Sequence, residues 1–157
     1  MAYLIDGNNL LGRIAPHELR EPAGREGLVA RLLAFQRVTR ARIHLVFDGN
    51  PDVSPTDIVV NPKFTIHYPG EGGSADDVIR DMIARQTDRR RFYVVSSDRA
   101  IRDEAKKKGL APVTSEVFAR ELKAAIKEGR RRELEKRVVI PTGLEVDLWD
   151  EVFRSKP

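Results

Sequence analysis

The chain has 157 residues, of which 41% are hydrophobic and 33% charged, enough for one globular domain with a sizeable core. It contains no cysteine, so disulfides, zinc–thiolate sites and thiol nucleophiles are excluded. No stretch approaches the roughly 18 apolar residues of a membrane-spanning helix, and no signal-peptide pattern precedes the first strand, so we expect a cytoplasmic protein. The net charge of +4 is compatible with a polyanionic partner but does not require one.

The chain begins with a predicted strand. Residues 3–5 are apolar and are followed by Asp6 and by turn-forming residues at 7–9, which is typical of a short buried strand. Residues 10–21 are mixed in character and predict irregular structure. The proline-containing stretch 50–62 predicts a loop or, at most, an edge strand. Four further strands are predicted at residues 43–47, 64–68, 92–95 and 110–113.

Four helices are predicted between and after these strands. Apolar spacing places one at residues 27–40 and another from Ser74 onward. A third helix ends before Gly109, which provides a C-terminal cap, and a fourth occupies residues 115–127 until Gly129 interrupts it. The residues expected to face the core are Leu28, Leu32 and Phe35 in the first helix, and Val78 and Met82 in the second, with Ile79 and Ile83 as further candidates.

Strands that alternate with helices predict an α/β fold. We expect three layers, α/β/α, with a central, mainly parallel sheet whose five strands follow the order 3-2-1-4-5. We also expect a single domain over residues 1–157, with a basic helical C-terminal part from about residue 115. In the tail, apolar pairs at i, i+4 within residues 146–153 favour a terminal helix docked on the core of the same domain over a partner interface.

Acidic residues lie where the predicted chain direction changes. Asp6 ends the first strand, Asp48 ends the second and Asp98 ends the fourth. Asp76 and Asp77 lie in the opening turn of the second helix. Because the carboxyl ends of parallel strands lie along one edge of a sheet, the three strand-end acids are expected to converge there. In the order 3-2-1-4-5, Asp6 and Asp98 face each other across the switch point.

Such a cluster of acids predicts a metal site. Two carboxylates about 4 Å apart repel each other by roughly 4 kcal/mol at an effective dielectric near 20, so either their pKa values rise or cations bind. Oxygen donors without histidine or cysteine suit Mg²⁺ or Mn²⁺. One or two such ions would polarise a phosphate and lower the pKa of a water molecule. The chemistry that follows is metal-assisted hydrolysis of a phosphodiester bond.

Each acid also has a purely structural interpretation. Asp6 and Asp48 each precede a glycine and can be turn formers. The residues around Asp77 match a helix capping box, and Asp98 can be a helix N-cap. Because neighbouring helical residues point about 100° apart, we expect one of Asp76 and Asp77 to be a direct metal ligand and the other to lie behind it. The coincidence of all these acids on one edge favours the metal site.

Polar side chains beside the acids are candidates for positioning a phosphate or a water molecule. They are Asn8, Asn9, Ser96 and Ser97. Turn formation by the asparagines and capping of the strand end by the serines are the alternatives. The three histidines are not spaced like metal ligands, and no catalytic histidine is expected.

Four segments carry a recognisable set of motifs in chain order: YLIDGNNLLGR, LVFDG, GGSADDVIRDMI and YVVSSDRAIRDEAKKKGL. They resemble the motifs of the YacP-like NYN ribonucleases, a branch of the PIN-like nuclease superfamily, over about residues 3–115. The resemblance implies a PIN-like α/β/α fold and divalent-metal ribonuclease activity. It implies metal ligands at Asp6, Asp48, Asp76 or Asp77, and Asp98, all of which are present.

An acidic cleft repels RNA, so a positive surface is expected beside it. Residues 120–137 carry eight basic and four acidic side chains, and further basic residues follow the fourth strand. A solvated helix face is the alternative for each cluster. Aromatic residues make up only 6% of the chain, which favours recognition of backbone and shape over base stacking. The candidate RNA contacts are Arg13, Arg99, Arg102, Lys106, Arg130, Arg131 and Arg132.

The sequence therefore predicts an endoribonuclease that cleaves single-stranded or loop RNA with one or two Mg²⁺ or Mn²⁺ ions. The catalytic and metal-binding residues are expected to be Asp6, Asp48, Asp76, Asp77 and Asp98. The ribosome is a candidate partner, and no membrane partner is expected. Two other classes stay open: a non-catalytic module that binds RNA or the ribosome, and a metal-dependent phosphohydrolase that acts on small nucleotides.

Overall fold

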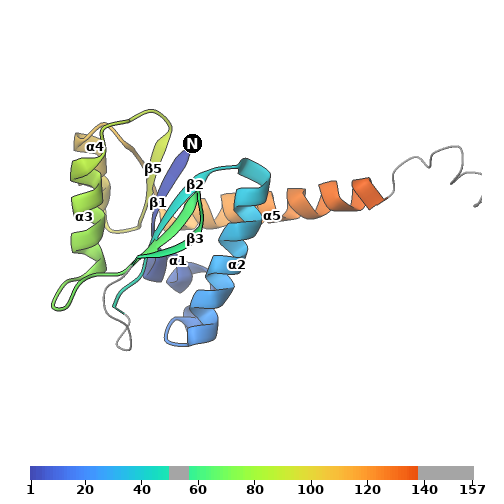
Figure 1. The fold of residues 1–157 in the computed structure, drawn as a ribbon, viewed down its shortest axis with the longest axis horizontal. Helices are drawn as coiled ribbons and strands as arrows, with labels where there is room; N and C mark the ends of the chain where they lie inside the picture. Colours follow the sequence, from blue (N-terminus) through green and yellow to red (C-terminus); the bar gives the residue numbers. More distant parts are fainter. Residues whose placement is uncertain (50–56, 138–157) are drawn as a thin grey trace, which may run out of the picture.

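The computed structural model describes residues 1–49 and 57–137. In this part of the chain, six strands form one sheet in the order β3-β4-β2-β1-β5-β6 (Figure 1). Strand β3 runs antiparallel to β4, and the other neighbouring strands are parallel. The strands are β1 (Ala2–Asp6), β2 (Arg42–Val46), β3 (Ile58–Asn61), β4 (Phe64–His67), β5 (Phe92–Val95) and β6 (Ala111–Val113).

The five predicted strands follow the expected order, because β4, β2, β1, β5 and β6 correspond to 3-2-1-4-5. The sixth strand, β3, lies in the region that predicted a loop or an edge strand, and it is an edge strand. Its position outside β4 extends the sheet without changing the order of the parallel strands.

Helices cover both faces of the sheet and complete the three layers (Figure 1). On one face α3 and α4 bury Ile79 and Ile101 against Val94 of β5. On the other face α1, α2 and α5 form the larger core, in which Leu32 and Phe118 are buried. The helices are α1 (Gly7–Ile14), the 3-10 helix η1 (Pro16–Glu18), α2 (Pro22–Thr39), α3 (Ala75–Arg85), α4 (Arg99–Lys107) and α5 (Ser115–Arg137).

The expected irregular structure at residues 10–21 is wrong. Helix α1 starts at Gly7, directly after β1, and its Leu10 and Leu11 are fully buried. A Cβ atom on Gly7 would lie 2.7 Å from the ring of Phe47, so only glycine lets the helix start this close to the chain that follows β2. Helix α2 begins at Pro22 rather than at residue 27, because proline fits the first turn of a helix.

Helix α3 has the predicted capping box. The Ser74 hydroxyl accepts a hydrogen bond from the backbone N–H of Asp77, and the Asp77 side chain accepts one from the backbone N–H of Ser74. The inward face differs slightly from the expected one: Ile79 and Ile83 are buried, whereas Val78 and Met82 pack partly exposed at the edge of the core.

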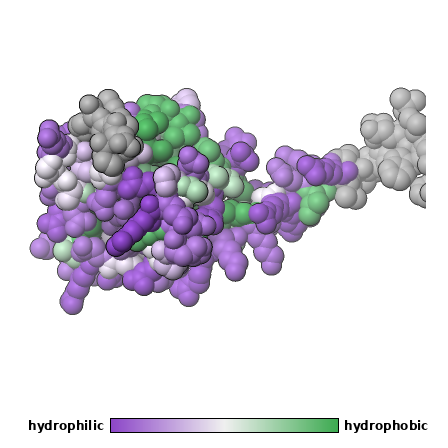
Figure 2. All heavy atoms as spheres, turned by 90° about the horizontal axis from the view of Figure 1, so that it is seen from below, coloured by the Kyte–Doolittle hydropathy of each residue, from purple (hydrophilic) through white to green (hydrophobic). Residues whose placement is uncertain are grey.

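Helix α5 continues through Gly129 to Arg137, so the predicted interruption is wrong. A Cβ atom on Gly129 would lie 2.9 Å from Cγ2 of Val38, which means that the glycine allows close packing of α5 on α2. The C-terminal part of α5 projects beyond the sheet in Figure 1, and it is mainly hydrophilic on the face shown in Figure 2. The predicted docking of residues 146–153, and with it the single-domain prediction to residue 157, falls outside the described residues. No helix among those described is both long and apolar enough to span a membrane.

Candidate active site

The sheet brings the strand-end acids to one edge. Asp6 is the last residue of β1, and the parallel registers pair it with Val46 of β2 and pair Ile5 with Val95 of β5. The loops that carry Asp48 and Asp98 therefore leave the sheet on either side of Asp6. The amino-terminal turn of α3, with its two aspartates, lies at the same edge, since the backbone N–H of Ala75 donates to Oδ1 of Asp48 at 3.3 Å.

Asp6 is the most buried of these acids, with 7% of its surface exposed. Its Oδ2 accepts a hydrogen bond from the Ser96 hydroxyl at 3.1 Å, and its Oδ1 accepts one from the backbone N–H of Asn9 at 3.5 Å. Burial raises the pKa of Asp6 from 3.8 to about 6, and the nearby charges of Asp76 and Asp48 act in the same direction, against these two hydrogen bonds. The ionised form of Asp6 is thus unfavourable in the protein alone.

The two aspartates of α3 differ in their surroundings. Partial burial raises the pKa of Asp76, and the neighbouring carboxylates of Asp98, Asp48 and Asp77 raise it further. Asp77 is exposed and closes the capping box. Asp76 is therefore the member of the pair that shares the electrostatic environment of the strand-end acids. Its role as a direct ligand stays a prediction.

Asp48 and Asp98 both contact helix N-termini, which the structural interpretation predicted for Asp98, whereas it predicted a turn former for Asp48. Asp98 caps α4, because its Oδ1 accepts from the backbone N–H groups of Ala100 at 2.8 Å and Ile101 at 3.4 Å. Oδ1 of Asp48 accepts from the first residue of α3. Each of these contacts uses only one oxygen of its carboxylate, so capping of a helix is compatible with a role as a metal ligand.

The four polar residues next to the acids connect the loops of the site. The fully buried Ser96 donates to Asp6 and accepts from the backbone N–H of Asp98 at 3.1 Å. Oδ1 of Asn8 accepts from the backbone N–H of Asp48 at 3.3 Å, and Oδ1 of Asn9 accepts from that of Ser97 at 3.0 Å. Ser96 and the two asparagines thus fix the relative positions of the loops that carry Asp6, Asp48 and Asp98.

Glu116, in the first turn of α5, is a further acid at this edge that the sequence interpretation missed. Its Oε2 accepts from the Ser97 hydroxyl at 2.8 Å, and its Oε1 lies 3.0 Å from Nε of Arg13. The hydrogen bond from Ser97 lowers the pKa of Glu116, and the charge of Arg13 adds to the effect. The sequence did contain a signal for Glu116: it lies in the first turn of the helix after the fifth predicted strand, as Asp76 lies in the first turn of the helix after the third. Arg13, expected to contact RNA, forms this ion pair, and its contact with RNA stays a prediction.

The other basic residues expected to contact RNA fall into two groups. Arg131 and Arg132 both pair with Glu128, Arg131 also pairs with Glu135, and Arg99 pairs with Asp103 at 4.0 Å. Among the described residues, Lys106 and Arg130 form no ion pair, and Nε of the half-buried Arg102 has no hydrogen-bond partner.

The donor chemistry of the site suits a hard divalent cation. It consists of carboxylate, amide and hydroxyl oxygens, which Mg²⁺ and Mn²⁺ prefer. Burial is the main cause of the raised pKa values of Asp6 and Asp76, and the charges of neighbouring carboxylates add to it; a bound cation would relieve this repulsion. In residues 1–49 and 57–137, no group of three or more histidine, aspartate or glutamate side chains is arranged closely enough to hold an ion as it stands.

Fold and site together define a three-layer α/β/α domain with acids at the carboxyl ends of its parallel strands. The family model of the YacP-like NYN domain matches residues 3–153, and the chain belongs to this family. Membership supports a nuclease-type function related to RNA.

Two crystal structures of Rae1 (YacP) from Bacillus subtilis have a similar fold. For the W164L mutant, the TM-score is 0.72 at 20% identity, and the match covers 94% of this chain and 89% of the Rae1 chain. The structure without this mutation gives a TM-score of 0.71 at 21% identity, with coverages of 99% and 91%. Similarity at this identity establishes the fold alone. No curated protein sequence matches the chain.

Proposed function

We propose that the protein is a divalent-metal-dependent endoribonuclease whose active site is formed by Asp6, Asp48, Asp76 and Asp98. The observation that carries the proposal is the raised pKa of Asp6, a buried acid held among other carboxylates at the carboxyl edge of the sheet. A protein gains no stability from such an arrangement, and perturbed acids of this kind cluster at functional sites. The YacP-like NYN family supports RNA as the substrate class.

The residues of the site have separable tasks. Asp6, Asp48, Asp76 and Asp98 would hold Mg²⁺ or Mn²⁺, while Asp77 would act mainly through the cap of α3. The bound metal would supply positive charge for a phosphate oxygen and would lower the pKa of a water molecule. Ser96 keeps Asp6 and the Asp98 loop together, and Asn8 and Asn9 tie the start of α1 to the Asp48 and Ser97 loops.

The substrate is expected to be single-stranded or loop RNA in the cytoplasm, either free or presented by the ribosome. An extended single strand of RNA can bring one phosphate to the acids at the carboxyl ends of the β-strands. The acids of the site and the polar residues that connect them include no aromatic side chain, which favours recognition of the backbone.

The test compares wild-type protein with Asp98→Asn and Asp103→Asn on end-labelled single-stranded RNA in Mg²⁺, Mn²⁺ or EDTA. Asparagine is also a good N-cap, so Asp98→Asn keeps the start of α4 while removing a charge from the site. We expect metal-dependent cleavage that falls by about 100-fold or more in Asp98→Asn. Asp103 lies one turn further along α4, and its replacement should leave cleavage within about twofold because a surface ion pair contributes little. Equal cleavage by both variants, or cleavage in EDTA, would overturn the proposal.

A further inference from the structure

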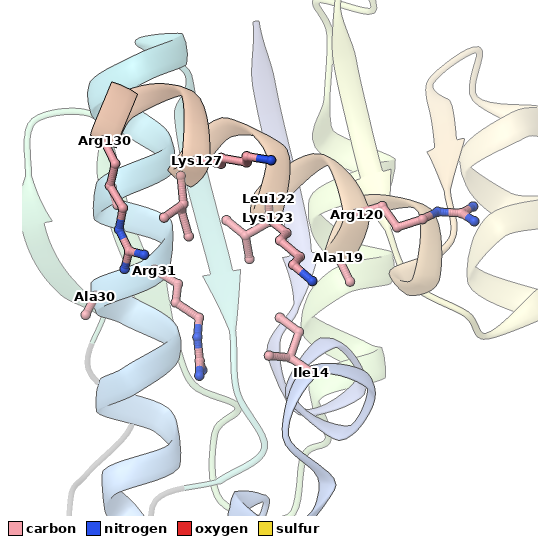
Figure 3. Close-up of a pocket in the computed structure, with 11 residues that line it drawn as sticks. Ile14, Ala30, Arg31, Ala119, Arg120, Leu122, Lys123, Lys127 and Arg130 are labelled. Carbon is pink, nitrogen blue, oxygen red and sulfur yellow. The ribbon is translucent and has the colours of Figure 1, made fainter. Parts of the chain in front are cut away.

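A groove of about 790 Å³ lies between the end of α1 and helices α2 and α5. Its floor consists of alanine and aliphatic side chains, among them Ile14 and Leu122. In Figure 3, Arg31 extends from α2 and Lys123 and Arg130 extend from α5 on the side of the groove, while Arg120 extends away from it. No acidic residue belongs to the lining, and its basic residues are Arg31, Arg120, Lys123, Lys127 and Arg130.

These cations lack protein counter-charges. Within residues 1–49 and 57–137, none of the five forms an ion pair, in contrast to Arg131 and Arg132 on another part of α5. Nη1 of Arg31 is in addition buried without a hydrogen-bond partner among those residues. A buried N–H of a charged group left without a partner is costly, so an anion in the groove would stabilise the guanidinium of Arg31 through its charge.

The positive surface continues along the same two helices. A second groove of about 510 Å³ shares Ala34, Ile126 and Arg130 with the first. It adds four basic residues, Arg37, Arg40, Arg132 and Lys136, of which Arg132 pairs with Glu128, and a single acid in the lining, Glu133. A compact anion would need only one cluster, whereas an extended run of positive charge suits a polyanionic strand.

The groove lies within reach of the acidic site. Helix α1 begins beside Asp6 and ends at Ile14 in the groove lining, so its eight residues span about 12 Å between the two regions. Helix α5 also begins at the acidic edge, where the Ser115 hydroxyl donates to Asn9. One strand of a few nucleotides could therefore contact both regions.

We infer that this groove binds the sugar–phosphate backbone of the RNA outside the bond that is cleaved, an inference that rests on the proposed function. Lysine and arginine at the rim contact phosphates, and the small apolar floor accepts sugars and base faces. No aromatic side chain lines the groove, so contacts to phosphates dominate there, and such contacts carry no information on base sequence. An acidic protein segment is the competing ligand, but the length of the combined grooves favours an RNA strand, which carries a negative charge on every nucleotide.

The experiment uses the full chain with Lys123→Glu and Lys127→Glu combined. Both side chains are exposed, so the reversal leaves the core intact. The matched control combines Arg85→Glu and Arg90→Glu, which make the same charge change at exposed positions at the end of α3 and in the following turn. The probe is a fluorescent single-stranded RNA, whose Kd is measured by anisotropy in EDTA over a range of salt concentrations.

The groove variant should bind this RNA about 10- to 100-fold more weakly at about 0.1 M salt, with a log–log salt slope smaller by about 1.4 for two lost phosphate contacts. In the presence of metal, KM for a long RNA should rise with little change in kcat. Affinity and slope equal to those of the control variant would overturn the inference, and selective loss of binding to an oligoglutamate peptide would then assign the groove to an acidic protein.

The two proposals fail in different ways. If the wild-type protein cleaves no RNA but only the groove variant loses RNA binding, the groove stands and the nuclease proposal falls. If cleavage depends on Asp98 but the groove variant has an unchanged KM, the nuclease stands and the groove falls.

Discussion

The acidic site and the basic groove are both clusters of like charge, but the protein holds them in opposite ways. The acids are tied by hydrogen bonds from neighbouring loops, and Asp6 is almost completely buried. Most of the basic side chains of the groove are exposed, and water and salt screen them. The difference suggests two tasks: a rigid arrangement at the acids for chemistry, and adaptable long-range attraction in the groove for binding.

The comparison predicts that the acidic site reduces the stability of the protein whereas the groove hardly does. Because the pKa of Asp6 is about 6 in the folded protein and 3.8 ordinarily, the folded state binds a proton more tightly than the unfolded state. The ionised carboxylate therefore destabilises the fold increasingly as the pH rises from about 4 to 6, and the full effect is present at pH 7.

The largest effect is expected for Asp6→Asn. It should abolish most RNA cleavage, by about 100-fold or more, because it removes a charged group from the centre of the site. The same variant should raise the free energy of unfolding at pH 7 by about 1–3 kcal/mol in EDTA and leave it nearly unchanged at pH 4. Denaturant unfolding at both pH values measures this. A variant that is equally destabilised at pH 4 and pH 7 would show that Asp6 is a structural acid.

A smaller effect is expected for Ser96→Ala, which keeps every carboxylate but removes the hydroxyl between Asp6 and the Asp98 loop. Since the hydrogen bond from Ser96 lowers the pKa of Asp6, its loss should raise that pKa further. We expect an upward shift in the carboxyl titration followed by NMR in EDTA, and cleavage reduced by about 10-fold.

The control for this variant is Ser97→Ala, whose hydroxyl contacts Glu116 rather than Asp6. It should leave the titration of Asp6 unchanged. If both serine variants shift that titration equally, the effect is a general disturbance of the loop rather than the specific contact of Ser96.

The smallest effect is expected in the groove, for Arg31→Met. Methionine keeps the apolar stem of the side chain and removes the buried N–H that has no partner among the described residues. Stability should stay the same or increase by up to about 1 kcal/mol, while RNA affinity falls several-fold. Thermal unfolding and anisotropy measure the two changes. A clear loss of stability would mean that the guanidinium serves the fold and not the ligand.

Much of the acidic site could be predicted from the sequence. Asp6, Asp48 and Asp98 follow apolar strands, and the convergence of parallel strand ends is a general rule that requires no knowledge of packing. Glu116 follows the same rule, because it lies in the first turn of the helix after the fifth predicted strand. The start of α1 could not be predicted, because it depends on the contact of Gly7 with Phe47, a residue forty positions away in the chain.

For the basic surface, the pairing of the side chains could not be predicted from the sequence alone. Arg131 and Arg132, two predicted RNA contacts that stay untested, both pair with Glu128, three and four residues earlier. That spacing is local and could have been read from the sequence, but only if the helix continues through Gly129. The continuation is decided by Val38 of α2, which packs where a larger residue at position 129 would not fit.

The sequence by itself thus determined the parallel strands and the acids at their ends, since hydrophobic alternation and turn residues act over a few neighbouring positions. Tertiary structure alone decided which of Asp76 and Asp77 lies in the electrostatic field of the other acids. It also decided which cations remain without a counter-charge, among them Arg31, Lys123 and Lys127. Burial and the distance between charges set pKa values and pairing, and both depend on segments that meet only in the folded chain.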